Sequence, residues 1–167
     1  GHFFNRLVFV FPSGEIQHYD KRHRFTLAGE DKVYTAGKEK LIIDYKGIKI
    51  CPLICYDLRF PVFARNVENY DVLLFVANWP EPRIKAWNSL LKARSIENMC
   101  YVVGVNRIGA DQNNHVYNGN SQVLDYLGDD LVQANEIEGV FIATIDKKSL
   151  DETGIKLGFL NDKDAFT

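Results

Sequence analysis

Three continuous apolar runs constrain the fold of this chain more than any other feature. Residues 48–54, 72–77 and 101–106 are short and rich in Ile, Leu and Val, which is typical of strands buried inside a sheet. Between them, residues 60–67 favour the start of a short helix, and residues 84–99 have an approximate helical period of apolar side chains. The alternation of strands and helices indicates a layered α/β protein.

Further strands are predicted on both sides of this segment. Upstream, we expect two β-hairpins, one joining residues 3–11 to 15–20 and one joining residues 41–45 to 48–54. Residues 27–37, which lie between the hairpins, are predicted to be irregular. Downstream, the predicted elements are strands at residues 122–125, 131–133 and 139–145, a turn at 128–130, a short helix at 149–156 and an arm at 158–167.

Composition bounds the class of protein. The 167 residues are 46% hydrophobic, so residues 1–167 can bury the core of one domain. A net charge of −2 without a basic stripe does not support binding to nucleic acid or to a membrane surface, and no apolar run approaches the length of a spanning helix. The three cysteines favour a reducing cytoplasm over a disulfide framework. No His lies close in sequence to Cys51 and Cys55, so we expect no metal site there.

Cys55 lies where the first apolar run ends and a polar, turn-like segment begins. A thiol at this strand-to-helix corner is held by the sheet, and the backbone N–H groups that follow, Tyr56 first, point towards any group bonded to the sulfur. This arrangement favours a nucleophile with oxyanion donors. The alternative is an inert structural cysteine, which is what most lone cysteines in apolar runs are.

Several motifs occur in a fixed order along the chain and resemble those of the nitrilase superfamily of carbon–nitrogen hydrolases. They are the charged cluster at residues 19–24, which by itself could also be a solvated loop, the Gly29-Glu30 pair and the segment from Cys55 to Pro61. Further matching segments lie at residues 76–80, 93–98, 105–109 and 119–121. The details look most like the bacterial omega-amidase branch, which hydrolyses the terminal amides of small α-keto acids.

The resemblance implies a role for three side chains and one backbone group. Cys55 would be the nucleophile, Lys21 the lysine of the family's Glu-Lys-Cys triad, and Glu30 a second glutamate that supports the lysine and the substrate. Lys21 and the Tyr56 N–H would stabilise the negative charge on the amide oxygen. Lys21 would also favour the thiolate, ammonia would leave, and water would hydrolyse the thioester. No metal or organic cofactor is needed.

The family's fold is an α-β-β-α sandwich, in which two sheets face each other between outer helices. Its members commonly form dimers, so the resemblance implies a homodimer that binds a small-molecule amide. The chain departs from the family at its start, because only His2 and Glu15 precede Lys21 as plausible bases. The family's general-base glutamate lies well upstream. We therefore expect the chain to be the C-terminal two-thirds of an amidase, with part of one layer missing, and to be inactive or nearly so alone.

Other residues have two interpretations. Arg59 and Arg83 could each bind a substrate carboxylate or form a structural ion pair, and the ion pair is favoured slightly for Arg59. Asn78 and Trp79 could line the pocket, although Trp79 is as suited to packing. Cys51 and Cys100 are predicted core residues.

Three rival functions remain. One is a nitrile or N-carbamoyl hydrolase of the same superfamily. Another is a thiol hydrolase that uses His23 or His115, although both are better explained as loop or packing residues. The third is a non-catalytic scaffold.

Overall fold

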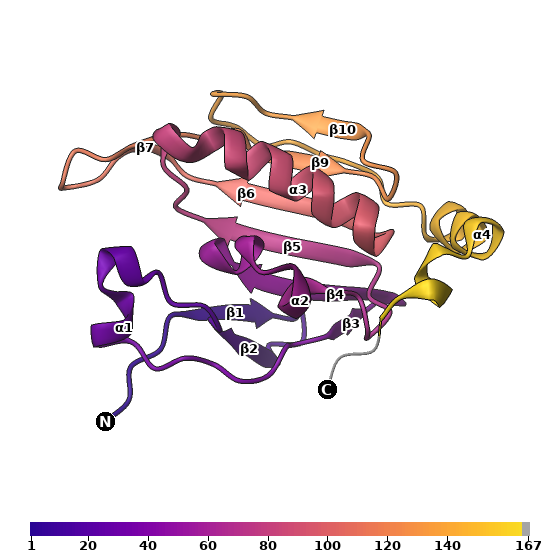
Figure 1. The fold of residues 1–167 in the computed structure, drawn as a ribbon, viewed down its shortest axis with the longest axis horizontal. Coiled ribbons are helices and arrows are strands. Elements are labelled where there is room, and N and C mark those ends of the chain that lie inside the picture. The colour runs from indigo at the N-terminus through magenta and orange to yellow at the C-terminus, as the bar shows by residue number, and fades with distance from the viewer. Residues whose placement is uncertain (165–167) are drawn as a thin grey trace.

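The computed structural model describes residues 1–164, and its centre is a six-stranded sheet (Figure 1). Across the sheet the order is β10 (Asp130–Gln133), β9 (Gln122–Leu124), β6 (Tyr101–Asn106), β5 (Val72–Ala77), β4 (Ile48–Ile54) and β3 (Ile43–Tyr45). The central strands β4, β5 and β6 are parallel, and the outer strands are antiparallel to their neighbours. The carboxyl ends of the three central strands therefore meet at one edge.

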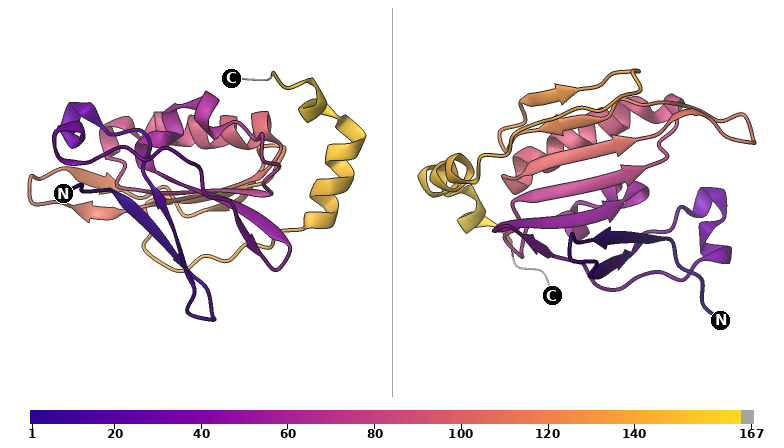
Figure 2. Two further views of the ribbon diagram at one scale, coloured as in Figure 1. Left: turned by 90° about the horizontal axis from the view of Figure 1, so that it is seen from below. Right: turned by 180° about the vertical axis from the view of Figure 1, so that it is seen from behind.

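Helices cover one face of this sheet (Figure 2). The 3₁₀ helix η2 (Cys55–Arg59) and helix α2 (Pro61–Ala64) follow β4, and helix α3 (Ile84–Asn98) follows β5. Trp87 and Leu91 of α3 are fully buried against the sheet. Gly104 of β6 permits this close packing, since a Cβ atom there would lie 2.5 Å from a methyl carbon of Leu91.

Two hairpins lie beside the main sheet (Figure 1). Strands β1 (Arg6–Val10) and β2 (Ile16–Asp20) form the first, which contacts β4. Strands β7 (Ile108–Ala110) and β8 (Val116–Asn118) form the second, directly after β6. The chain then returns through β9 and β10 to helix α4 (Lys147–Leu157) and the 3₁₀ helix η4 (Phe159–Asp162), at the far end of the sheet.

The mixed α/β fold is confirmed, and the structure confirms most of the predicted elements. Both upstream hairpins, the three apolar strands, the strands at β9 and β10 and the helices α2, α3 and α4 form where the sequence indicated them. Of the expected sandwich layers, the described residues form one helix layer, the six-stranded sheet and the small β1–β2 sheet. Within residues 1–164, no helix combines the length and apolar character needed to cross a membrane.

Several local predictions were wrong. Residues 27–37 are not wholly irregular, because 3₁₀ helix η1 (Thr26–Ala28) and helix α1 (Glu30–Val33) form around Gly29, which adopts a left-handed conformation with φ 74°. Residues 139–145 form no strand, and Val140 and Ile142 are exposed. The β7–β8 hairpin was not predicted. Of the arm at 158–167, the described part begins with η4, and residues 165–167 lie outside the described residues.

Candidate active site

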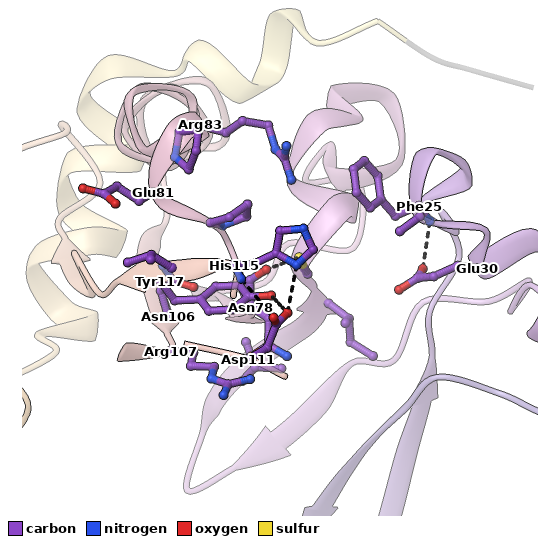
Figure 3. A pocket seen from close by; sticks show the side chains of 18 of the residues that line it. Phe25, Glu30, Asn78, Glu81, Arg83, Asn106, Arg107, Asp111, His115 and Tyr117 are labelled. Carbon is purple, nitrogen blue, oxygen red and sulfur yellow. Dashed lines mark hydrogen bonds and ion pairs between the residues drawn. The ribbon is translucent and has the colours of Figure 1, made fainter. Parts of the chain in front are cut away.

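A cavity of about 1090 Å³ lies at the carboxyl ends of the parallel strands (Figure 3). Cys55, Asn78 and Arg107 are the residues that directly follow β4, β5 and β6, and all three line it. Open α/β sheets bind ligands at this edge because neighbouring strands end there together. The β2 end, helix α1 and the β7–β8 hairpin complete the wall, with Lys21, Glu30 and Tyr117 among the lining residues.

Cys55 is held in a strained backbone conformation at the mouth of this cavity. Its φ is 46°, a left-handed value that costs a residue with a side chain about 1–2 kcal/mol. The strain arises because strand β4 turns directly into η2 at this residue. Its Sγ lies 4.0 Å from the carbonyl oxygen of Asn78. Cys51 and Cys100 are fully buried as predicted, so Cys55 is the cysteine available to a ligand.

The thiol of Cys55 is harder to deprotonate than an ordinary cysteine. Burial raises its pKa above the ordinary value, and the positive charge of Lys21 and a backbone hydrogen bond at Asn78 only partly oppose this. Lys21 therefore favours the thiolate, as expected, but the effect of burial on the pKa is larger. Chemistry at this sulfur needs a base to remove its proton.

Lys21 and Glu30 form a nearly enclosed ion pair. The ammonium of Lys21 donates to both carboxylate oxygens of Glu30, at 2.9 and 2.7 Å, and Lys21 is buried. One of the same oxygens also accepts from the Phe25 N–H at 2.8 Å. The backbone N–H of Lys21 donates to the Asn5 carbonyl, which fixes the end of β2. Glu30 therefore neutralises and orients Lys21.

Tyr56 has two separate environments. Its N–H lies in the first turn of η2, where backbone donors lack an intrahelical acceptor. Its ring packs between the rings of Phe25 and Phe60, at centroid distances of 4.9 and 5.1 Å, and is not part of the cavity lining. Only its backbone is therefore a candidate to contact a ligand at the sulfur.

Of the two candidate arginines, one lines the cavity and the other does not. Arg83 lines the cavity, with its guanidinium carbon 5.3 Å from the centre of the Phe25 ring. Arg59 does not line it, because its guanidinium stacks on Trp79 at 4.9 Å. Neither arginine pairs with an acidic side chain of residues 1–164, so the ion pair favoured for Arg59 is not found there.

Neighbouring residues Asn78 and Trp79 lie in different environments. Asn78 is exposed and lines the cavity, whereas Trp79 is a core residue that packs on Trp87. The indole N–H of Trp79 donates to the Arg83 carbonyl at 2.8 Å. Trp79 does not line the cavity but fixes the loop that carries Arg83.

The two candidate histidines also differ. His23 does not line the cavity; its Nδ1 lies 2.9 Å from Asp57 Oδ1, and its ring stacks on Phe60 at 3.7 Å. His115 does line the cavity, and its Nδ1 lies 3.1 Å from Asp111. The packing interpretation of His23 is therefore confirmed.

The β7–β8 hairpin adds residues that the sequence did not indicate. Asp111 accepts a hydrogen bond from the Tyr117 hydroxyl at 2.9 Å, and Arg107 stacks on the Tyr117 ring. Desolvation raises the pKa of Asp111, but hydrogen bonds from the His115 and Asn113 N–H groups and from Tyr117 outweigh it and lower the pKa to about 2. The polar hairpin tip looks like an ordinary solvated loop in the sequence, so no local signal identifies it.

The donors in the cavity do not form a metal centre. Among residues 1–164, no three His, Cys, Asp or Glu side chains are arranged to hold a metal ion. The chemistry available from the described residues is that of a thiol beside an enclosed cation.

Comparison with known proteins gives a consistent result. A sequence model of the family described as Carbon-nitrogen hydrolase matches residues 1–154. The chain is 54% identical over 130 residues to omega-amidase YafV of Yersinia enterocolitica. This match covers 78% of this chain and 51% of that protein. It is 37% identical over 146 residues to 2-oxoglutaramate amidase of Bacillus subtilis, covering 86% of this chain and 56% of that protein. The chain thus spans little more than half the length of these curated relatives.

A solved structure agrees with the sequence matches. XC1258 from Xanthomonas campestris, a CN-hydrolase superfamily protein with an arsenic adduct in its active site, superposes with a TM-score of 0.96 and 46% identity. The match covers 98% of this chain and 65% of XC1258. With its strained cysteine beside an enclosed lysine at the sheet edge, this chain belongs to the carbon-nitrogen hydrolase family.

Proposed function

We propose that the protein containing this chain is an amidase that converts the terminal amide of a small α-keto acid into a carboxylate and ammonia. One observation carries the proposal: Cys55 lines one cavity together with Lys21 and Glu30, which come from a distant part of the sequence. The relatives named omega-amidase and 2-oxoglutaramate amidase support this substrate class.

In the proposed reaction, the Cys55 sulfur attacks the amide carbon. A base removes the thiol proton, a C–S bond forms, and negative charge develops on the amide oxygen. Lys21 and the Tyr56 N–H stabilise that charge. Removing one such donor from a comparable site lowers kcat by about 10²–10³.

The intermediate then collapses in two balanced steps. The C–N bond breaks, the leaving nitrogen takes the proton held by the base, and ammonia departs from a Cys55 thioester. Water then gives a proton to the base and attacks the thioester carbon. The C–S bond breaks, the acid product leaves, and the sulfur regains its proton.

We assign the general base to a glutamate in a segment that precedes residue 1, so that this chain is the C-terminal two-thirds of the enzyme. Two observations support this assignment. The pKa of Cys55 is raised by burial, so a base is needed. The Glu30 carboxylate is occupied by Lys21 and the Phe25 N–H, which suits it to orienting the lysine.

Arg83 is the proposed anchor for the substrate carboxylate. Its guanidinium faces the cavity across from Glu30 and has no acidic partner among residues 1–164 (Figure 3). A planar guanidinium binds a carboxylate through two hydrogen bonds. Asn78, which lines the same cavity, is a further proposed substrate contact. Arg59 and Trp79, which do not line the cavity, are left out of the substrate site.

A cytoplasmic homodimer belongs to the same proposal. The free thiols of Cys51, Cys55 and Cys100 agree with a reducing compartment. Light scattering of the purified protein measures the assembly, and a monomer at working concentration would contradict the dimer.

The decisive experiment measures ammonia released from 2-oxoglutaramate by the chain extended with its preceding segment. We expect turnover that is abolished by Cys55→Ala, and little turnover by residues 1–167 alone. A nitrile and an N-carbamoyl compound are tested in parallel. Faster hydrolysis of either would replace the amidase assignment, and full activity of residues 1–167 would remove the need for an upstream base.

One observation favours a second candidate, a thiol hydrolase that uses a histidine base. His115 lines the cavity and contacts Asp111, as a catalytic histidine oriented by a carboxylate would. Two variants separate the candidates. The amidase mechanism predicts that Lys21→Ala abolishes turnover. The histidine mechanism predicts that His115→Ala abolishes turnover and that Lys21→Ala has only a small effect.

A further inference from the structure

Asp57 is a fully buried carboxylate with four hydrogen-bond donors and no assigned role. One oxygen accepts from the Tyr19 hydroxyl at 2.8 Å and from the Ile54 N–H at 3.0 Å. The other accepts from the His23 N–H and the His23 ring Nδ1, both at 2.9 Å. A buried carboxylate is stable only when its lone pairs are occupied in this way.

The donors come from two segments that are distant in the sequence. Tyr19, in strand β2, lies two residues before Lys21, and His23, just after the strand, lies two residues after it. Ile54 and Asp57 itself lie on either side of Cys55. The Asp57 carboxylate is therefore a direct hydrogen-bonded connection between the backbone that carries the lysine and the turn that carries the thiol.

The connection is reinforced within the lysine segment. Tyr19 is 1% exposed, and its hydroxyl accepts from the Arg22 N–H at 3.0 Å while donating to Asp57. Burial, together with the Asp57 charge, raises the pKa of Tyr19, so the hydroxyl keeps its proton and remains a donor. The backbone on both sides of Lys21 is therefore fixed to Asp57.

We propose that Asp57 is a positioning residue that holds the Lys21 ammonium opposite the Cys55 sulfur. The proposal rests on the function proposed above for Lys21 and Cys55, but it concerns their relative placement and not turnover. Asp57 acts through these two residues and need not touch the substrate.

The test measures how strongly Lys21 influences Cys55 with and without Asp57. The rate of Cys55 alkylation by iodoacetamide is followed by mass spectrometry at mildly alkaline pH. Because loss of the Lys21 charge raises the pKa of the Cys55 thiol and lowers its thiolate fraction, we expect Lys21→Met to slow labelling in the otherwise unchanged chain. In the Asp57→Asn background, the same change should slow labelling by less than about twofold.

Asp71→Asn is the matched control. Asp71 is also buried and accepts from the Lys49 N–H at 2.7 Å and from Lys147 at 2.8 Å, but it precedes β5, at the opposite end of the sheet from the cavity. In that background Lys21→Met should keep its full effect. An equal effect of Lys21→Met in the Asp57→Asn and Asp71→Asn backgrounds would overturn the proposal.

Two further points keep the test decisive. If circular dichroism shows that Asp57→Asn does not fold, Tyr19→Phe replaces it, because this change removes one donor and leaves the carboxylate in place. A reduced Lys21 effect in Tyr19→Phe supports the proposal, and an unchanged effect overturns it. Alkylation needs no substrate, so absent amidase activity would refute the proposed function while leaving this measurement valid.

Discussion

The ammonium of Lys21 contacts both carboxylate oxygens of Glu30, and Lys21 is only 2% exposed while Glu30 is 21% exposed. A cation so enclosed depends on this acidic partner, since little water reaches it. We therefore expect mutations of either residue of the pair to be costly.

Replacing Glu30 with Gln should impair both stability and turnover. Loss of the charge leaves Lys21 paired only with a neutral amide, and we expect the free energy of unfolding to fall by about 1–3 kcal/mol. We expect kcat to fall by about 10²-fold, the order seen when an oxyanion donor is lost. Urea unfolding and ammonia release measure the two effects. Glu68→Gln, which breaks the Lys40–Glu68 pair outside the cavity, is the control and should leave kcat unchanged.

Labelling of Cys55 should have a midpoint at higher pH than an ordinary thiol. Burial raises its pKa, while Lys21 lowers it, so Lys21→Met should move the midpoint to still higher pH. Alkylation rates across neutral and alkaline pH measure the midpoint. Cys51 is an internal control, because it is fully buried and burial raises its pKa to about 12. A midpoint that moves to lower pH in Lys21→Met would contradict the electrostatic role of the lysine.

Changing Arg83 to Met should weaken binding of charged substrates selectively. A hydrogen-bonded charge contributes about 1.5–3 kcal/mol, so we expect KM for 2-oxoglutaramate to rise about 10–100-fold with a small change in kcat. An uncharged amide of similar size should show no such loss. Arg59→Met, which alters the arginine outside the cavity, serves as the reference variant. Equal losses for both substrates would exclude Arg83 as the carboxylate anchor.

Removing the Cys55 side chain should relieve the strain in its backbone. At φ 46°, Gly avoids a cost of about 1–2 kcal/mol but adds flexibility to the unfolded chain. Cys55→Gly should therefore be more stable than Cys55→Ala by up to about 1 kcal/mol. The same comparison at Cys51, inside strand β4, should have the opposite sign, because Gly weakens a strand. Urea unfolding of the four variants tests both signs.

The sequence correctly predicted the local structure at Cys55, where a motif coincides with a strand end. Cys55 was expected at a strand-to-helix corner and lies there, between β4 and η2. Lys21 and Glu30 were connected to it only through the family resemblance. Their contact spans nine residues and depends on Gly29, whose left-handed conformation precedes helix α1. Local pattern alone did not indicate this helix.

Other features could not be predicted because they depend on packing between distant segments. Asn78 and Trp79 are adjacent, yet one faces the cavity and the other packs on Trp87. In helix α3, the apolar Ile96 is 51% exposed, whereas the charged Arg94 is buried and donates to the Leu58 carbonyl. Tertiary contacts therefore contribute to the orientation of helix α3 in addition to its apolar period.

Most of the strands, the principal helices and the position of the candidate nucleophile were predictable from the amino-acid sequence. Each follows from the spacing of apolar residues along a few turns or a single strand, which is a local property. Only the tertiary structure decided that Lys21, Glu30 and Asp57 converge around Cys55 and that Arg83, not Arg59, lines the cavity. The reason is physical: parallel strands bring their ends together through long connections, so the neighbours of a strand end are set by the register of the whole sheet.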